Sequence, residues 1–476
     1  MTNKSILLII CFSLNLIAQS GLIKLKNDID KIVDDEFFEH SQIAIEIYDL
    51  TDGISLYEHN NKLLLHPAST MKLLTTAAAL FYLGTDYQFT TELYHTGVIE
   101  SATLYGDLFI VGGLDPDFTI DNIDSLVSII NSLGIKYITK NLYADTSVKD
   151  SIYWGRGWMW DDDPDPGAPY LSALNINDNA IVVFVDGGEV DSAALITLDP
   201  NTAYLTIANN CKTVASPEPN DLEITRDWQN DKNTIIVSGK VRQGVIIDSS
   251  EHSEKLNLLE PDKYFLTLFK EHLEDNGVEV KGDIKIKNLP DNSVYLSSIK
   301  RSIDKVLTNI NKESDNLSAE MLLYALALND SGVPAISENG IEAINNLVDT
   351  IGLDHEDYSF ADGSGVSRYS LVSAKLLTEV LKYFYYANNN LFNIYYNSLP
   401  VAGVDGTLKK RMRGTKAENN VHAKTGTLSG VSNLSGYVTA LNGNLLAFSI
   451  LIQNFLDETN EARSIQDKIC ELLANY

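Results

Sequence analysis

The sequence has little positive charge and no long apolar run after its first twenty residues. Its 36 lysines and arginines face 65 aspartates and glutamates, which gives a formal net charge of −29 at pH 7. This charge disfavours phosphate backbones and anionic lipids, so we expect no nucleic-acid partner and no binding to an anionic membrane surface. No later segment is apolar enough to cross a membrane.

Cysteine is scarce as well, with three in 476 residues. Cys11 lies in the apolar N-terminal segment, whereas Cys211 and Cys470 lie far apart in the rest of the chain. These two are either buried thiols or a disulfide formed in an oxidising compartment, and the sequence leaves both open. We find no Cys/His spacing typical of a metal site and no phosphate-binding loop, so we expect no metal and no cofactor.

The first twenty residues have the pattern of a secretory signal. Lys4 supplies a positive region, residues 6–17 are mostly apolar, and small residues suitable for cleavage follow at 18–20. A retained membrane anchor is the alternative, but the apolar run is short for a bilayer span. Ile10 is too bulky to precede a good lipid-attachment cysteine. We therefore expect a secreted, periplasmic protein without a membrane span after cleavage.

Apolar periodicity predicts one domain that is interrupted by a long insertion. The expected helices and strands of the first and last parts cover residues 22–38, 43–48, 54–57, 69–83, 303–311, 318–328, 337–351, 374–388, 422–424, 434–441, 444–453 and 458–474. Asn442-Gly443 favours a two-residue turn between the last two strands. The N-terminal hairpin and the C-terminal strands together predict a five-stranded antiparallel sheet flanked by helices, an α/β (α+β) arrangement.

The middle of the chain has a different character. Short strand-like runs and Gly-rich turns dominate it, and one helix is expected at 123–133. A chain of 476 residues is also too long for one ordinary core. We therefore expect a signal peptide at 1–20, a catalytic domain made of 21–90 and 293–476, and a β-rich insertion of two subdomains at 91–292.

A Lys-Thr-Gly motif in His422–Thr427 ends a predicted strand. Its ammonium group and hydroxyl can hold a carboxylate while the strand backbone pairs with an extended peptide. The glycine would let a substrate lie close against the backbone. Taken alone, the tripeptide is equally compatible with an ordinary junction between a strand and a turn.

Ser69 and Lys72 lie three residues apart at the start of a predicted helix, so both face the same side. The lysine can take the serine proton if burial or a positive neighbour lowers its pKa from about 10.4. The same spacing recurs at Ser297 and Ser302, in a charged stretch typical of a solvated surface. A surface lysine is therefore the alternative for Lys72 as well.

Ser314-Asp315-Asn316 lies between two predicted helices. The serine can relay a proton, and the amide can hold a substrate carbonyl or the lysine. The alternative is an ordinary loop and helix-capping role.

The order of the three motifs resembles that of penicillin-binding proteins and serine β-lactamases. Because a long insertion separates Lys72 from Ser314, the chain resembles the D-alanyl-D-alanine carboxypeptidase/endopeptidase family S13, the class C low-molecular-mass penicillin-binding proteins. Residues 111–116, 158–162, 172–179, 362–368 and 399–408 also resemble family patterns. Leu114 and Ser370 depart from them, outside the three motifs. The resemblance implies a serine β-lactamase/DD-peptidase-like catalytic domain.

The resemblance also implies a hydrolase that acts on peptidoglycan stem peptides and is acylated by β-lactam antibiotics. Ser69 would attack the carbonyl between two D-alanines, and Lys72 would accept its proton. Ser314 and Asn316 would relay the proton to the leaving amine and hold the acyl side.

Further substrate-binding roles are implied for five residues. Lys424 and Thr425 would bind the terminal carboxylate, and the backbone N–H groups of Ser69 and Thr427 would bind the oxyanion. Asp162 would meet the free amine of a diamino acid in the stem peptide, although an exposed loop acid is at least as compatible with its surroundings.

Two features near the Lys-Thr-Gly motif have competing interpretations. A basic cluster either draws in anionic peptides or is a solvated loop; it consists of Lys409, Lys410, Arg411, Arg413 and Lys416. His422 suggests a Ser-His-Asp arrangement, but a structural role is favoured because a lysine base needs no histidine.

Two other functions remain as alternatives. A β-lactamase or esterase on the same scaffold is disfavoured by the large insertion and by the absence of an obvious Glu-x-x-Leu-Asn motif. A catalytically silent cell-wall binding protein is disfavoured because Ser69, Lys72 and Lys424 are all present. The sequence does not separate carboxypeptidase from endopeptidase activity.

Overall fold

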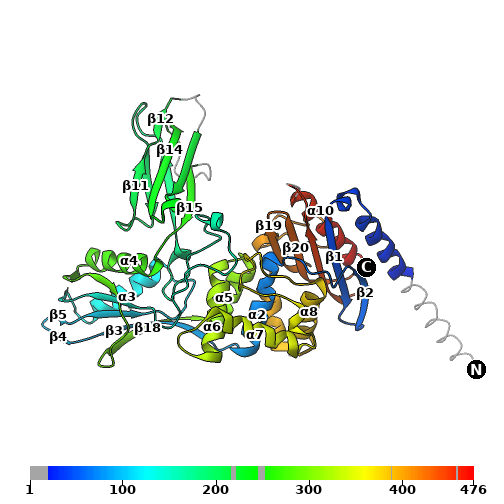
Figure 1. Ribbon diagram of the computed structural model, residues 1–476, viewed down its shortest axis with the longest axis horizontal. Helices are drawn as coiled ribbons and strands as arrows, with labels where there is room; N and C mark the ends of the chain where they lie inside the picture. Colours follow the sequence, from blue (N-terminus) through cyan, green and yellow to red (C-terminus); the bar gives the residue numbers. More distant parts are fainter. Residues whose placement is uncertain (1–19, 216–220, 245–251, 388, 457–458) are drawn as a thin grey trace, which may run out of the picture. The chain divides into compact units, whose positions relative to one another are not determined.

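Figure 1 shows the computed structural model, which describes residues 20–215, 221–244, 252–387, 389–456 and 459–476. The expected signal peptide, with Lys4 and Cys11, lies outside the described residues apart from Ser20. Within the described ranges, no helix is both long enough and apolar enough to cross a bilayer.

The chain forms two compact units, each discontinuous in sequence. Unit 1 consists of Met1–Thr85, Leu307–Asp315 and Ile341–Tyr476, and unit 2 consists of Asp86–Val306 and Asn316–Gly340. The domain boundaries expected from the sequence stay a prediction, and the two units are described separately.

The centre of unit 1 is a five-stranded antiparallel sheet in the order β19-β20-β21-β1-β2. Its strands are β1 (Gln42–Asp49), β2 (Ile54–His59), β19 (His422–Leu428), β20 (Val431–Thr439) and β21 (Leu445–Gln453). β1 pairs with β21, so strands from the two ends of the chain lie side by side (Figure 1). The predicted sheet is confirmed, and β19, which carries the Lys-Thr-Gly motif, is its edge strand.

Apolar side chains on alternate strand positions give this sheet two buried faces. Ile45, Leu434 and Ile450 belong to a buried cluster with Ile465 of helix α10 (Thr459–Ala474). Helix α8 packs against the opposite face, where Thr378 donates a hydrogen bond to Ser449 of β21 (2.9 Å). Side chains at alternate positions of β19 therefore point toward different helices.

Unit 1 contains further helices and 3-10 turns besides α10. They are a helix over residues 20–33, the 3-10 turns η1 (Glu36–Glu39), η2 (Ala68–Thr70), η6 (His355–Asp357) and η7 (Gly406–Leu408), and helices α2 (Met71–Tyr82), α8 (Ala374–Ala387) and α9 (Asn389–Ser398). Helices α5 (Ile303–Lys312) and α7 (Ser337–Thr350) pass from one unit to the other along the chain.

Two local expectations in unit 1 were wrong. Ala440 donates its N–H to Asn444 O (2.8 Å), so the last hairpin has a three-residue loop in which Gly443 adopts a φ of 89°. Helix α9 was not expected from its aromatic-rich sequence. Tertiary packing holds it, because the fully buried Tyr395 donates a hydrogen bond to Leu73 O (3.0 Å).

In its described residues, unit 2 holds four sheets, in the orders β10-β9-β15, β11-β14-β12 with β13 beside β14, β16-β7-β5-β4 and β17-β8-β6-β3-β18. Their strands are β3 (Gln88–His95), β4 (Val98–Glu100), β5 (Thr103–Tyr105), β6 (Leu108–Val111), β7 (Tyr137–Ile138), β8 (Leu142–Asp145), β9 (Ala180–Asp186), β10 (Leu195–Asp199), β11 (Thr206–Asn209), β12 (Lys212–Val214), β13 (Asp221–Arg226), β14 (Thr234–Arg242), β15 (Ser253–Asn257), β16 (Glu279–Val280), β17 (Ile284–Ile286) and β18 (Val294–Ser302). The 3-10 turns η3 (Trp160–Asp162), η4 (Asn177–Asn179) and η5 (Trp228–Asn230) connect some of them.

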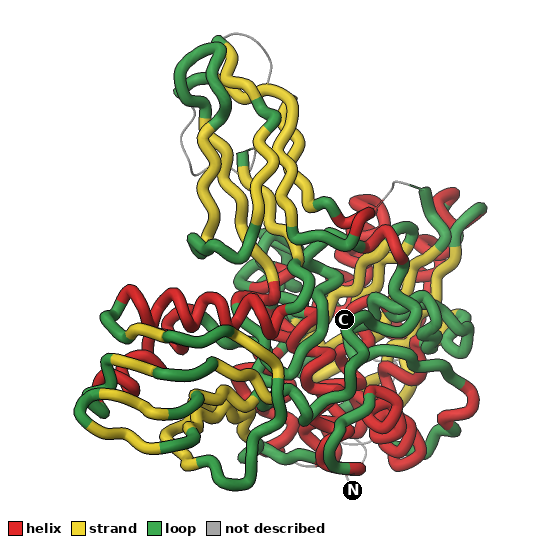
Figure 2. The backbone as a smooth tube through the Cα atoms, turned by 60° about the vertical axis from the view of Figure 1, so that its left-hand side comes forward, coloured by secondary structure: helices red, strands yellow, loops and turns green. Residues whose placement is uncertain are grey.

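The helices of unit 2 lie beside these sheets, and one was missed. Helix α3 (Ile120–Ser132) fits the expected helix, and α6 (Asn316–Ser331) follows the Ser-Asp-Asn motif. Helix α4 (Pro261–Asp275) packs with α3 against the largest sheet (Figure 2). The expectation of a single helix in the insertion was therefore wrong. Pro261 at the first helical position and the spacing of Phe265, Phe269 and Leu273 were the available signal.

Cys211 and Cys470 are both free, buried thiols. Burial raises the pKa of each above its ordinary value. We therefore expect neither to be a reactive thiolate at neutral pH.

Candidate active site

Ser69 and Lys72 meet at the start of α2, as their spacing predicts. Lys72 Nζ donates to Ser69 Oγ at 3.1 Å and to the carbonyl of Ser364 at 2.8 Å. The Lys72 side chain is completely buried, so its interpretation as a surface lysine was wrong. A buried amine in hydrogen-bond contact with a hydroxyl is the arrangement that a lysine base requires.

The carbonyl of Ser364 orients Lys72 and was not singled out from the sequence. Asp362 holds its turn by accepting hydrogen bonds from Ser364 Oγ (3.0 Å) and from the N–H of Ser367 (2.7 Å). Gly365 has a φ of 84°, and a Cβ there would lie 1.9 Å from Ala68 O. Residues 362–368 resemble a family pattern, so the sequence marked this segment as notable. The pattern alone did not indicate that the Ser364 carbonyl orients Lys72.

The backbone around Ser69 is fixed from the sheet side. Asn433 of β20 donates its amide to the carbonyls of His66 and Pro67 at 2.9 and 2.8 Å. Ala68 has a φ of 45°, which is costly for a residue with a side chain. The strained residue directly before the nucleophile is therefore held by buried hydrogen bonds.

Gly426 of the Lys-Thr-Gly motif allows β19 to approach Ser69. A Cβ on Gly426 would lie 2.8 Å from Pro67 O and 3.1 Å from Ser69 N. The sequence suggested that this glycine makes room for a substrate. That role stays a prediction, and the structure shows that the missing side chain also allows the strand to pack against the turn that carries the serine.

Lys424 is the second buried lysine of the site. Its Nζ donates to Ser314 Oγ (2.9 Å) and to the carbonyl of Thr425 (3.1 Å). Burial and the neighbouring charge of Lys72 hold the pKa of Lys424 well below its ordinary value. Two buried ammonium groups repel each other, so this pair is expected to lose one proton more easily than an isolated lysine does.

Ser314 lies in a strained backbone conformation after α5, with a φ of 65°. Lys312 anchors this segment by donating to Asp405 (2.6 Å) and to Leu399 O (3.0 Å). A Cβ on Gly406 would lie 2.5 Å from Lys312 O, so the loop around Gly406 can approach only because that residue is glycine. Strain of this kind is common at functional sites.

Thr425 and Thr427 point to the α10 side of β19, away from Lys424. Thr425 lies opposite Leu434, which packs with α10, whereas Lys424 lies opposite Ser435 on the other face. The two threonines line a cavity of about 770 Å³ together with Ser69, Ser314, Gly406, Thr407, Lys409, Lys410, Arg411, Asn460, Arg463, Ser464 and Asp467. Unit 1 thus contains six of the expected site residues, and the three on β19 lie on two faces of that strand, Lys424 on one and Thr425 and Thr427 on the other.

Asn316 and Asp162, the other two expected site residues, belong to unit 2. Asn316 opens α6 and donates its amide to Gly167 O. Asp162 accepts a hydrogen bond from the N–H of Met159 at 2.7 Å, which caps a short 3-10 turn. Its substrate role stays a prediction.

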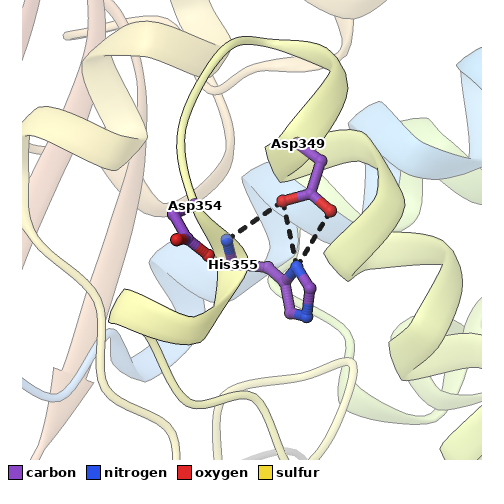
Figure 3. Close-up of side chains that lie close together, drawn as sticks. All are labelled: Asp349, Asp354 and His355. Atoms are coloured by element: carbon purple, nitrogen blue, oxygen red, sulfur yellow. Dashed lines mark hydrogen bonds and ion pairs between the residues drawn. The ribbon is translucent and has the colours of Figure 1, made fainter.

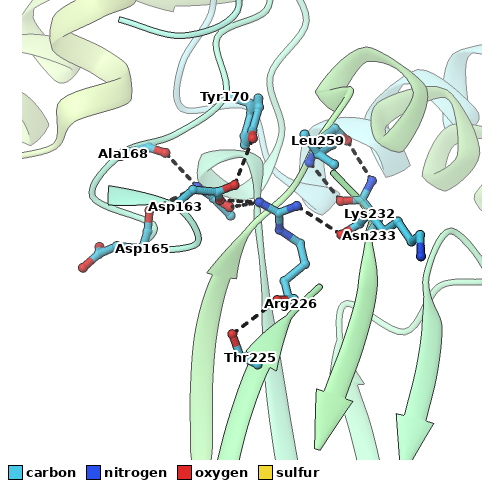
Figure 4. A network of polar contacts seen from close by, with 10 residues as sticks. Asp163, Asp165, Ala168, Tyr170, Thr225, Arg226, Lys232, Asn233 and Leu259 are labelled. Atoms are coloured by element: carbon cyan, nitrogen blue, oxygen red, sulfur yellow. Dashed lines mark hydrogen bonds and ion pairs between the residues drawn. The ribbon is translucent and has the colours of Figure 1, made fainter. Parts of the chain in front are cut away.

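A buried ion pair holds the loop that contains Gly167 (Figure 4). Arg226 of β13 pairs with Asp163, which also accepts a hydrogen bond from Tyr170 (3.0 Å). Asn257 accepts from Arg226 at 3.1 Å and donates to Ala168 O at 2.8 Å. This network ties the small sheet of β11–β14 to the loop that Asn316 contacts.

Comparison with known proteins assigns the chain to a family. The model of the D-Ala-D-Ala carboxypeptidase 3 (S13) family matches residues 25–476. The chain belongs to the S13 family. The resemblance seen in the three motifs is therefore confirmed.

Several relatives of this S13 protein match it over nearly its whole length. A D-alanyl-D-alanine carboxypeptidase from Actinomadura sp. (strain R39) is 33% identical over 470 residues, which cover 96% of this chain and 85% of that protein. The crystal structure of penicillin-binding protein 4 (dacB) from Haemophilus influenzae has a TM-score of 0.82 at 26% identity and covers 94% of this chain and 99% of that chain. A second structure of that protein, in complex with a β-lactam, has a TM-score of 0.76 at 25% identity and covers 93% and 98% of the two chains.

Arg463 lines the cavity beside Ser69, and the sequence did not single it out. It lies on α10 and donates to the hydroxyl of Thr427 at 3.4 Å. No motif surrounds it, because its helix is distant in sequence from the three motifs. Only the packing of α10 on the sheet brings it to the cavity.

His422 has surroundings that fit a structural residue. Its ring stacks on Tyr396 with a centroid distance of 4.1 Å. Burial and the charge of Lys312 lower the pKa of His422, so it is expected to be neutral at pH 7. The stacking supports the structural interpretation over a Ser-His-Asp arrangement.

Asp349, Asp354 and His355 gather at the end of α7 (Figure 3), with ligand atoms within 4.8 Å of one another. His355 Nδ1 lies 2.9 Å from Asp349, and the N–H of His355 donates to the same carboxylate at 3.1 Å. This hydrogen bonding raises the pKa of His355 and lowers the pKa of Asp349. The contacts account for the cluster as a tie between α7 and η6.

Proposed function

We propose that this protein is a serine-type D-Ala-D-Ala carboxypeptidase that acts on peptidoglycan stem peptides through an acyl-enzyme on Ser69. The observation that carries the proposal is the contact of the buried Lys72 amine with Ser69 Oγ. Family membership supports the substrate class. We also propose a secreted, periplasmic location and acylation by β-lactam antibiotics.

Acylation begins with Lys72 as the base. The neutral amine of Lys72 takes the proton of Ser69 while Ser69 Oγ forms a bond with the carbonyl carbon of the penultimate D-alanine. The C–N bond then breaks, and Ser314 donates its hydroxyl proton to the leaving amine and receives the proton that Lys72 took from Ser69, which leaves Lys72 neutral again. Water hydrolyses the resulting ester and frees Ser69.

Substrate binding uses the open edge of β19. An extended peptide pairs there as an added strand, and Thr425 and Lys424 bind its terminal carboxylate. The N–H groups of Ser69 and Thr427 hold the oxyanion, aided by the N-terminus of α2. Asn316 holds the acyl side and Asp162 the free amine of a diamino acid, both by resemblance to the family.

The proposal is tested by incubating the protein with a fluorescent penicillin and mapping the adduct by mass spectrometry, and by measuring D-alanine release from a pentapeptide stem. We expect a stable adduct on the peptide that contains Ser69 and release of D-alanine. No adduct would contradict the proposal. Rapid β-lactam turnover without D-alanine release would instead indicate a β-lactamase.

Lys424→Met is expected to slow acylation and shift its pH dependence. Acylation needs a neutral Lys72, so the acylation rate increases with pH as Lys72 loses its proton. Because the positive charges of Lys72 and Lys424 lie close together, we expect this increase at a pH below the ordinary lysine pKa. Removing one charge moves the rise to higher pH. Because each pKa unit changes the neutral fraction tenfold, we expect acylation at pH 7 to fall at least about tenfold.

The measurement is the rate of penicillin acylation from pH 6 to pH 10, with the exposed Lys416→Met as control. A variant with an unchanged pH profile and a raised KM would show that Lys424 only anchors the substrate.

A further inference from the structure

We propose that a tyrosine-lined groove within unit 2 binds the glycan strand that carries the stem peptides, a chain of N-acetylated amino sugars. Among the described residues, the groove shares no lining residue with the cavity beside Ser69. The choice of ligand rests on the proposed function, since an enzyme that acts on stem peptides meets them attached to this glycan. A second contact with the same polymer would raise the local concentration of stem peptides.

The groove consists of two hollows that share part of their lining. The smaller has a volume of about 310 Å³ and the larger a volume of about 620 Å³. Tyr153, Tyr170, Leu259 and Glu260 line both hollows. Both volumes lie in the range of ligand pockets, and the common wall suits an elongated ligand that places successive units in the two hollows.

Stacked tyrosine rings form the common wall. The ring of Tyr153 stacks on that of Tyr170 with a centroid distance of 5.7 Å and an interplanar angle of 15°. Because Tyr170 covers one face of this ring and Tyr153 is still 60% exposed, the other face of Tyr153 is open to solvent. The C–H groups on one side of a sugar ring can pack against such a face, whose negative quadrupole attracts their partial positive charge.

Hydrogen bonds fix the walls of the groove. Tyr204 and Asn233 both donate to the carbonyl of Leu259, at 2.8 and 3.0 Å. Asn233 also accepts a hydrogen bond from the N–H of Leu259 at 2.9 Å (Figure 4). The N–H of Leu171 donates to Tyr153 O at 2.9 Å and so holds the loop that carries Tyr153. Walls that are fixed in advance lose little conformational entropy when a ligand binds.

The lysines of the groove are already paired with acids. Lys149 Nζ lies 3.1 Å from Asp150, and Lys232 Nζ lies 3.3 Å from Asp227. An anionic ligand would have to compete with these ion pairs in a chain whose net charge is −29. The groove therefore favours a ligand that carries hydroxyl groups over one that carries phosphates or carboxylates.

Each hollow also offers a carboxylate that can accept hydrogen bonds from sugar hydroxyls. Asp262 lines the smaller hollow and Asp231 the larger. Burial and the charge of Glu260 raise the pKa of Asp262, so hydrogen bonds donated to its charged form would be favourable. Leu171 and Ala173 line the smaller hollow as well and give the methyl group of an acetamido substituent an apolar contact.

The test titrates the full-length protein with a neutral tetramer of N-acetylglucosamine and follows tryptophan fluorescence. All four tryptophans of the chain lie in unit 2, and Trp154 contacts Tyr170 with a centroid distance of 5.1 Å. The variants are Tyr153→Ala and Asp262→Asn. Tyr105→Ala is the matched control, because Tyr105 is a 54% exposed tyrosine of unit 2 that does not line the groove. The melting temperature reports on the integrity of each variant.

We expect the parent to bind the tetramer, with affinity lowered about threefold to tenfold in Tyr153→Ala and about tenfold in Asp262→Asn. The affinity should change less than about twofold in Tyr105→Ala, and less than about twofold when the salt concentration rises about tenfold, because the ligand is neutral. A parent that does not bind the tetramer, or an equal loss in Tyr105→Ala, would overturn the inference. Binding of trilysine in place of the tetramer would overturn it as well, since the groove would then recognise ammonium groups.

Activity measurements separate this inference from the proposed function. Tyr153→Ala should release D-alanine from a free pentapeptide at the parent rate. Its kcat/KM for the same pentapeptide attached to a glycan strand should fall about threefold to tenfold, through a raised KM. An unchanged kcat/KM on the glycan-linked substrate would overturn the inference alone. A parent that binds the tetramer but neither forms a penicillin adduct nor releases D-alanine would overturn the proposed function.

Discussion

Ser69→Ala is expected to form no covalent adduct with penicillin and to release D-alanine at least about 10⁴-fold more slowly than the parent. The substitution removes the attacking oxygen and leaves Lys72 its hydrogen bond to Ser364 O. Since little else changes in the packing, the melting temperature should stay within a few degrees of the parent value, by an estimate of about 1 kcal/mol for one lost hydrogen bond.

Ser297→Ala is the matched control for this experiment. Ser297 has a lysine three residues later, as Ser69 does, but it lies in the middle of β18. The Ser297→Ala variant should be acylated by penicillin at the parent rate. An adduct of undiminished yield on Ser69→Ala, or loss of the adduct in Ser297→Ala, would contradict the assignment of the nucleophile.

Lys72→Met is expected to lower the acylation rate by about 10³-fold, the typical effect of removing a general base. Methionine keeps most of the buried volume and removes the amine that contacts Ser69 Oγ. It also removes a positive neighbour of Lys424, whose lowered pKa should then rise toward its ordinary value. The measurement is the penicillin acylation rate as a function of pH.

The exposed Lys300→Met serves as a control for Lys72→Met, since Lys300 ends the second Ser-x-x-Lys sequence. Acylation of Lys72→Met at the parent rate, with the parent pH profile, would show that another group takes the Ser69 proton. A large fall in melting temperature would show instead that Lys72 acts mainly on stability, by bonding Ser364 O.

Local patterns predicted the elements whose neighbours in sequence determine them. Strict alternation and flanking turns located β1, β2 and the C-terminal strands, and pairing the two ends of the chain predicted the five-stranded sheet. Some errors occurred where packing overrides local preference, and others occurred although a local signal was present. The Asn442-Gly443 turn has three loop residues, and α9 depends on the burial of Tyr395. Helix α4 was missed although Pro261 and its apolar spacing were visible in the sequence.

In the site, too, some contacts follow from local spacing in the sequence and others depend on tertiary packing. The spacing of Ser69 and Lys72 predicted their contact because three residues of helix place both side chains on one face. The contact of Lys424 with Ser314 joins residues 110 positions apart and could be inferred only through resemblance. The basic cluster could not be resolved from the sequence, since Lys409 and Lys410 line the cavity and Arg413 and Lys416 do not.

The sequence by itself determined the chemical groups of this protein, their order along the chain and the sheet that carries them, because these depend on local spacing and periodicity. The tertiary structure alone decided which groups from distant parts of the chain share an environment. Lys72 and Lys424 lie close together in the buried site, and the charge of Lys72 lowers the pKa of Lys424. Because Gly426 has no side chain, β19 can pack closely against Ser69. The packing of α10 brings Arg463 to Thr427, and a charge distant in sequence can reach a site only through such packing.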